Sequence, residues 1–201
     1  MSTFTVTIDH GYKIWETAAP PKDNTRPILQ GIYIDSIGYA VATDGFILAA
    51  VPITITPTGF PSALVPASFL KQVWKDAPQT RPITFDITLN EDSTTIVSTG
   101  TVCAGEAKAD LLPYIFPKWR NLANATVYGT SPPMHVAYHP AEMLKVLKAI
   151  GREKDGWADT FFHPSHGPAL IVSKDDAYGL VMPCYSNMTT VPESVRKIFG
   201  G

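Results

Sequence analysis

Residues 66–71, PASFLK, return 74 residues later as PAEMLK at positions 140–145. Each copy is followed at nearly the same interval by the triplet Ile-Val-Ser, at 96–98 and at 171–173. A repeat that keeps its offset and its order indicates one supersecondary unit used more than once. In both copies a helix pattern comes first and strand patterns follow.

The N-terminal part of the chain carries a weaker copy of this unit. It has a strand pattern at 3–8, a short helix pattern at 11–18, and strand patterns at 28–35, 40–43 and 46–55. The later units are expected to have strands at 83–89, 94–98 and 102–112, and at 160–163, 169–173 and 178–182. Asp44-Gly45 is typical of a tight hairpin turn, and Pro52 indicates an edge strand or a strand with a break. The sequence predicts an α+β fold of about three helix-plus-antiparallel-strand modules.

Composition and charge exclude several classes of protein. The 201 residues are 45% hydrophobic and 17% charged, as expected for a folded soluble domain rather than a disordered chain. The sequence has no signal-peptide pattern and no apolar run that could span a membrane, so we expect a cytoplasmic protein whose Cys103 and Cys184 are buried free thiols. A net charge of -2 argues against a surface that is basic all over.

Basic residues nevertheless gather on one face of each predicted helix. On a helical wheel the apolar residues Phe69, Leu70, Val73 and Trp74 lie opposite Lys71 and Lys75. In the third module the apolar residues Met143, Leu144, Val146, Leu147 and Ile150 lie opposite Lys145, Lys148 and Arg152. Such faces suit contact with phosphates, although lysine is also common on any solvated helix.

Five short motifs, in a constant order, resemble one family. They are 24–32 (NTRPILQGI), 41–49 (VATDGFILA), 64–66 (LVP), 116–119 (FPKW) and 179–183 (GLVMP). Together they resemble the bacterial-type DNA polymerase III beta sliding clamp, the ring-shaped processivity factor of replicative polymerases. Phe46 and Ile47 replace the usual His-Arg of that family, and Cys184 replaces a methionine. The chain is about half the family's usual length, as in a shortened phage or mobile-element version.

The resemblance implies a non-enzymatic protein without cofactor or metal. Residues 1–122 would form a domain like the clamp's middle domain, and 123–201 would hold half of its last domain with an extension. Family rings contain about twelve modules, so about four copies would close one ring. The implied partners are double-stranded DNA, bound without sequence preference, DNA polymerase and other proteins with clamp-binding motifs, and a clamp loader.

The resemblance also implies two sets of site residues. DNA would be contacted by Lys71, Lys75, Lys145, Lys148 and Arg152, with Lys13 and Arg26 as further candidates in the first module. A hydrophobic cleft for partner peptides would be formed by Thr43, Gly45, Phe46, Ile47, Leu48, Pro66, Leu70, Leu180, Val181, Met182, Pro183 and Cys184. The same apolar residues could instead be ordinary sheet core.

Other functions are weaker alternatives. Ser68 and Lys71 fit the Ser-x-x-Lys pattern of serine acylases, but its companion motifs are absent from the sequence. His163 and His166 could ligate a metal, but no third ligand is evident. The main alternative is a clamp-like peptide-binding or regulatory module that does not encircle DNA, because fold alone does not fix function.

Overall fold

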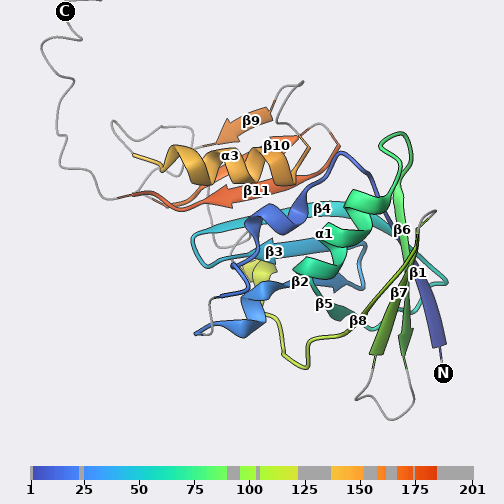
Figure 1. Ribbon diagram of the computed structural model, residues 1–201. Helices are drawn as coiled ribbons and strands as arrows, with labels where there is room; N and C mark the ends of the chain where they lie inside the picture. The colour runs from blue at the N-terminus through green and yellow to red at the C-terminus, as the bar shows by residue number, and fades with distance from the viewer. Residues whose placement is uncertain are drawn as a thin grey trace, which may run out of the picture.

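A computed structural model describes residues 2–22, 25–89, 96–102, 105–121, 137–151, 158–161, 167–173 and 175–184. In this part of the chain each helix is followed by an antiparallel strand meander, which confirms the predicted α+β fold (Figure 1). The first module contains β1 (Ser2–Ile8), the 3-10 helices η1 (Ile14–Thr17) and η2 (Pro27–Gln30), β2 (Gly31–Asp35), β3 (Tyr39–Thr43) and β4 (Ile47–Thr56). The helix of this module is short, since Pro20 and Pro21 follow soon after η1 ends.

The second and third modules have longer helices. The second contains β5 (Ala63–Pro66), α1 (Ala67–Asp76), β6 (Ile83–Leu89), β7 (Ile96–Val102) and β8 (Gly105–Asp110). The third contains α3 (Pro140–Ala149), β9 (Ala158–Phe161), β10 (Ala169–Ser173) and β11 (Tyr178–Val181). The sequence repeat therefore marks a structural repeat, because PASFLK begins α1 and PAEMLK begins α3. The predicted strands differ from the observed ones mainly at their ends. β2 begins three residues after its predicted start at residue 28, because Pro27–Gln30 form η2, and β7 ends four residues after its predicted end at residue 98.

The first two modules exchange strands. β1 pairs with β4 of its own module and also with β6 of the second. β5 pairs with β2 of the first module, and the backbone N–H of Leu112, just after β8, donates to the Leu64 carbonyl of β5 at 2.9 Å. The third module joins the first through antiparallel pairing of β11 with β4.

Pro52 left two alternatives open, an edge strand or a strand with a break, and the edge strand is wrong, because β4 has neighbours on both sides. β3 borders one side, and on the other side β11 pairs as far as Ala50 and β1 pairs from Ile53. The N–H of Ile53 donates to Gly38 toward β3, so the nitrogen of Pro52 faces the opposite side. Pro52 therefore lies where the neighbouring strand changes, and its missing donor breaks no ladder bond there.

Buried side chains pack on both faces of the sheet. Ala40 and Ala42 of β3 face the main core beneath the helices, whereas Val41 faces a second cluster on the opposite side. This alternation follows from the two-residue period of a strand. Phe116 and Trp119, from the segment 111–121 that follows β8, cover the second cluster.

α3 buries most of the face that the wheel predicts, with Leu144 as the exception: Met143 and Leu147 are partly buried against the main core. Val146, Ala149 and Ile150 have no exposed surface, whereas Leu144 is 46% exposed. Gly179 in β11 allows close packing, because a Cβ at that position would collide with the Val146 side chain. Since η1 and β11 pack against the Val146 side of this face, the prediction that Leu144 is buried is wrong.

Candidate nucleic-acid and peptide interfaces

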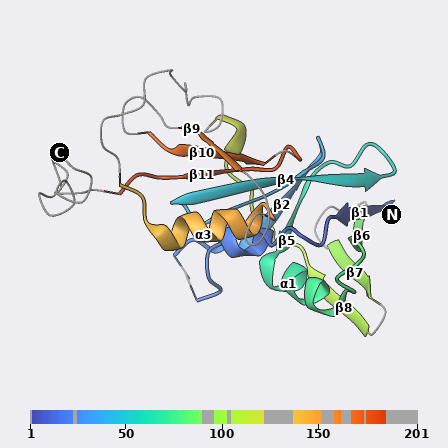
Figure 2. The ribbon, with the colours of Figure 1, turned by 90° about the horizontal axis from the view of Figure 1, so that it is seen from above.

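The three helices lie side by side on one face of the sheet, with η1 between α1 and α3 (Figures 1 and 2). The N–H of Lys13, at the start of η1, donates to the carbonyl of Lys148 in α3 at 3.3 Å. On the other side the rings of Trp15 and Trp74 lie 5.1 Å apart and connect η1 to α1. Trp74 also donates through Nε1 to the carbonyl of His10 at 2.9 Å. All three modules therefore contribute to one continuous helical face.

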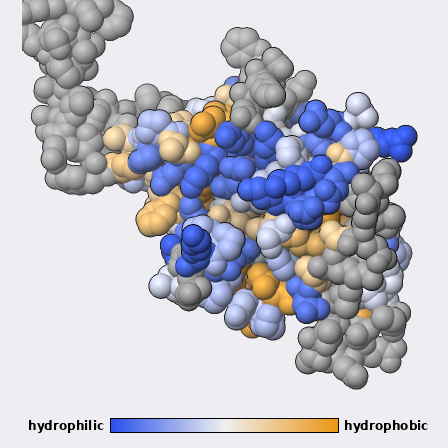
Figure 3. All heavy atoms as spheres, in the orientation of Figure 1, coloured by the Kyte–Doolittle hydropathy of each residue, from blue (hydrophilic) through white to orange (hydrophobic). Residues whose placement is uncertain are grey.

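The predicted DNA-contacting lysines lie on these helices. Lys71 and Lys75 are exposed on α1, and Lys145 and Lys148 are partly exposed on α3. Lys13 lies beside η1, with its Nζ 5.6 Å from the ring centre of Trp74. Arg152 lies outside the described residues. Figure 3, which views this face, shows hydrophilic residues over much of it.

Acidic side chains reduce the net charge of the helical face. Glu16, Asp76 and Glu142 belong to the same three helices as the lysines. Lys145 reaches the β3–β4 turn, where its Nζ lies 3.9 Å from a carboxylate oxygen of Asp44. The side chain of Lys145 is 45% exposed, so water screens this ion pair and the interaction is weak. The face is basic, but only modestly.

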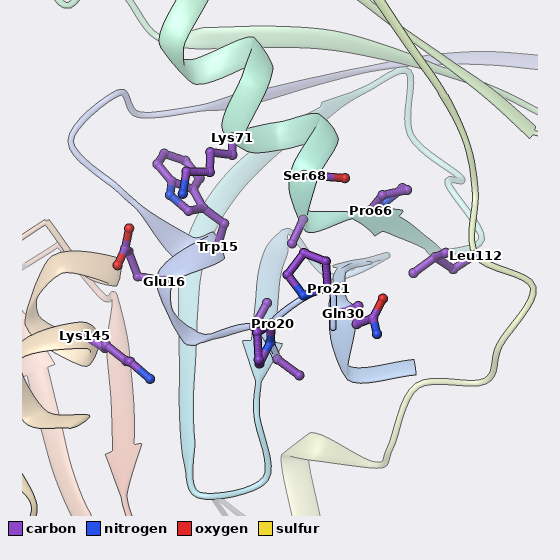
Figure 4. Close-up of a pocket in the computed structure, with 13 residues that line it drawn as sticks. Trp15, Glu16, Pro20, Pro21, Gln30, Pro66, Ser68, Lys71, Leu112 and Lys145 are labelled. Carbon is purple, nitrogen blue, oxygen red and sulfur yellow. The ribbon is translucent and has the colours of Figure 1, made fainter. Parts of the chain in front are cut away.

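A pocket of about 400 Å³ opens between these helices (Figure 4). Trp15, Pro20 and Pro21 form apolar walls, and Lys71 and Lys145 contribute ammonium groups from α1 and α3. In Figure 4 Lys145 reaches in from α3, while Pro66 and Ser68 lie at the start of α1. Pro66, predicted to line the peptide cleft, thus lines this helical-face pocket.

Hydrogen bonds hold the turn between β3 and β4 in a defined shape. Asp44 Oδ1 accepts bonds from the N–H groups of Phe46 and Ile47 at 2.9 and 3.0 Å. Thr43 Oγ1 accepts from Gly45 at 3.0 Å and donates to the carbonyl of Ile47 at 2.6 Å. Residues 44–46 separate the strands, so this loop is longer than the two-residue turn that Asp-Gly suggests. Gly45 is required by its φ of +95°.

β11 brings the predicted C-terminal wall of the cleft next to this turn. Leu180 pairs with Leu48, and the N–H of Met182 donates to the carbonyl of Phe46 at 3.0 Å. Phe46 is 55% exposed and Met182 is 45% exposed, so two apolar side chains emerge together. Pro183 is partly exposed and Cys184, which we expected to be buried, is exposed. We call Phe46, Met182, Pro183 and Cys184 the turn surface.

Several predicted cleft residues support this surface from within. Ile47, Leu48, Leu180 and Val181 are each 5% exposed or less, and Thr43 is 9% exposed. Leu70 is 1% exposed beneath α1, so it offers a peptide no surface in this structure. The sequence could not separate these roles, because apolar residues in strands and helices serve core and cleft alike.

Arg26 contributes to the turn surface rather than to the helical face. Its guanidinium lies over the Phe46 ring, with Cζ 5.8 Å from the ring centre. A Cβ at Gly45 would collide with the same guanidinium. The Phe46 ring is therefore supported by a cation on one side, in a geometry that favours cation–π attraction.

Sequence reasoning missed a polar cluster on the opposite face of the sheet. Asp35 is 2% exposed, and its carboxylate accepts hydrogen bonds from Trp119 Nε1 at 2.9 Å and Arg120 Nη2 at 2.6 Å. Burial, followed by the nearby Tyr39 hydroxyl, raises the pKa of Tyr178 to about 12. The cluster fixes the segment 111–121 against the sheet. No local pattern pointed to this cluster, because Asp35 precedes Trp119 and Arg120 by 84 and 85 residues in the chain.

Solved structures resemble this chain over most of its length. A putative DNA polymerase III beta subunit from Eubacterium rectale matches with a TM-score of 0.58 and 11% identity, over 100% of this chain and 69% of that one. The DnaN sliding clamp of Bartonella birtlesii, bound to griselimycin, matches with a TM-score of 0.60 and 16% identity over 92% and 66% of the two chains. The beta subunit from Streptococcus pyogenes matches with a TM-score of 0.56 and 16% identity over 97% and 67%.

This chain has the fold of the beta sliding clamps. The resemblance inferred from the sequence motifs is confirmed at the level of fold, at sequence identities of 11–16% among the structures compared. No protein-family model matches the sequence, and no curated protein matches it. The match covers about two-thirds of each of these clamps, namely 69%, 66% and 67% of their chains.

Two other features are absent from the described residues. None of their helices is long and apolar enough to cross a membrane. They also contain no cluster of three His, Cys, Asp or Glu side chains that could hold a metal ion. The candidate metal ligands His163 and His166 lie outside the described residues. The two surfaces described above therefore remain the candidate sites.

Proposed function

We propose that this chain is a sliding-clamp subunit that presents its helical face to duplex DNA. The observation that carries the proposal is the alignment of α1, η1 and α3 on one face of a clamp fold, with Lys71, Lys75, Lys145 and Lys148 on them. Ammonium groups on a helical face suit phosphates and carry no sequence information. The protein would act in the cytoplasm and hold DNA without changing any covalent bond, with no cofactor.

The assembly that encircles DNA would be a homo-oligomer. With three modules in the chain and about twelve in a family ring, four copies would close the ring. A clamp loader would open it. The polymerase and other partners would bind through short peptides, for which the turn surface offers the exposed apolar side chains of Phe46 and Met182.

Retention on DNA tests the proposal directly. The protein is bound to a nicked circular plasmid, with a loader if one is needed, and the plasmid is then linearised with a restriction enzyme. A ring held by topology stays on the circle and runs off the linear DNA, whereas a protein held only by contacts stays equally on both. Equal retention under both conditions would refute encirclement.

One observation favours the alternative of a clamp-like peptide-binding module. Glu16, Asp76 and Glu142 are interspersed with the lysines on the helical face, which weakens its attraction for DNA. Such a module would bind partner peptides at the turn surface without enclosing DNA. The retention experiment separates the two functions, and peptide binding at Phe46 would survive in both.

A further inference from the structure

Modules one and two complete each other by reciprocal strand pairing. The strand before the first helix, β1, pairs with β6, the first meander strand of module two. The strand before the second helix, β5, pairs with β2, the first meander strand of module one. Because each contact is the counterpart of the other, the two modules are related as two halves about a local two-fold axis.

The third module has the same internal construction. In modules one and two, the strand before the helix contacts the end of the module's own meander, as β1 does with β4. In module three, Ala137 precedes α3 and bridges to Cys184 after β11, where the Cys184 N–H donates to the Ala137 carbonyl at 2.7 Å. The third module is therefore built as one half of such a pair.

The other half is missing from the described residues. β2 and β6 each have a neighbour on both sides, whereas their counterpart β9 pairs with β10 alone among the residues that the structure describes. Asp159 and Thr160 of β9 are exposed, and Phe161 is 47% exposed. A strand edge with an apolar residue on it is a template for pairing with another chain.

α1 and α3 differ in burial in a corresponding way, with α1 more enclosed than α3. Leu70 in α1 and Leu144 in α3 occupy equivalent positions, 74 residues apart in the repeat. Leu70 is 1% exposed in a core that both modules of its pair enclose, but Leu144 is 46% exposed. The exposed leucine lies on the flank of α3 that a second module would cover.

We propose that the third module pairs with the third module of a second copy of this chain, about a true two-fold axis. The β9 edge of each copy would pair with residues 137–139, directly before α3, of the other, and both copies of Leu144 and Phe161 would become buried. A second copy is the expected partner because the partner of the third module must itself be a module of the same kind. The third module carries both surfaces that such a pair needs, the β9 edge and the residues directly before α3. The inference rests on strand pairing and burial, and it holds whether or not the assembly encircles DNA.

Light scattering without DNA tests this interface. We expect the full chain to run at a multiple of its 21.8 kDa mass, and the substitutions Leu144→Glu and Phe161→Glu to halve that mass. Each substitution occurs twice in a two-fold interface, so the dissociation constant of that interface should rise by at least about 100-fold. Ile115→Glu is the matched control, because Ile115 is 94% exposed on segment 111–121, and it should leave the mass unchanged. Circular dichroism verifies that each variant is folded.

Hydrogen exchange of the wild-type protein gives an independent test. Peptides that cover β9 should become more protected as protein concentration rises from nanomolar to tens of micromolar. Three results would each overturn the proposal: a 21.8 kDa monomer throughout that range, a mass that neither charge substitution changes, or β9 protection that is independent of concentration. The last result would mean that association with a second copy does not cover this edge. Because no step uses DNA, failure here is distinct from failure to encircle a plasmid.

Discussion

Neutralising two lysines on α1 should measure the contact of the helical face with DNA. Lys71 and Lys75 are exposed and lie one helical turn apart. Glutamine is one carbon shorter than lysine but has a similar helix propensity, so Lys71→Gln with Lys75→Gln should change stability by only about 0.5 kcal/mol. Any larger change in DNA binding therefore reports the lost charges.

The size of the effect follows from counterion release. Each phosphate contact contributes about 0.9 to the slope of log K against log salt, so losing two contacts should make that slope less steep by about 1.8. Between 50 and 200 mM salt the double variant should then lose about tenfold less affinity than the wild type. Fluorescence anisotropy of a short labelled duplex, titrated at several salt concentrations, measures both quantities.

Lys118→Gln is the matched control. Lys118 is exposed on segment 111–121, which covers the sheet face opposite the helices. Its neutralisation should leave the slope unchanged if DNA contacts the helices. Parallel salt plots for the wild type and the Lys71/Lys75 double variant would refute the assignment of the helical face, and a reduced slope for Lys118→Gln would move the contact to the opposite face.

Three further predictions concern the turn surface and the Asp35 cluster. Phe46→Glu should weaken binding of a clamp-binding peptide at least about tenfold by isothermal titration calorimetry, whereas Ile37→Glu, equally 55% exposed, should not; equal effects would exclude the turn surface. Asp35→Ala should lower the free energy of unfolding by about 2–4 kcal/mol in urea, because Trp119 Nε1 loses its buried acceptor, and a loss below about 1 kcal/mol would contradict this role. Because folding raises the pKa of Tyr178 from 10.0 to about 12, the neutral phenol stabilises the fold below pH 10, and that stability is lost as the pH rises toward 12. The loss should be about 1–2 kcal/mol in denaturant titrations, and Tyr178→Phe should abolish this part of the pH dependence.

Much of the fold could be predicted from local patterns. The repeat of PASFLK as PAEMLK located both long helices, and alternation located strands such as β6 and β10. These features depend on residues close together in the chain, where periodicity and helix propensity act directly. Asp44 and Gly45 likewise predicted a turn, although its three-residue length depends on hydrogen bonds from the Thr43 and Asp44 side chains.

The neighbours of each element were decided by tertiary structure. Pro52 predicted an edge strand or a strand with a break, and only the structure excluded the edge strand. β4 is central, and the change from β11 to β1 on one side leaves room for a residue without an N–H. The helical wheel placed both Val146 and Leu144 inside, but η1 and β11 pack only against the Val146 side of that face and leave Leu144 exposed. A hydrophobic periodicity indicates that one face of a helix is buried, but it does not indicate which neighbouring element covers that face.

The candidate sites also depend partly on local sequence and partly on tertiary structure. The sequence by itself determined which helices carry lysines and which turn carries Phe46, since both follow from local order. Only the tertiary structure decided that Met182 emerges beside Phe46, that Leu70 is core, and that Asp35 binds Trp119 from across the sheet. The physical reason is that such contacts join residues far apart in the chain, and their free energy depends on packing and desolvation that no local pattern records.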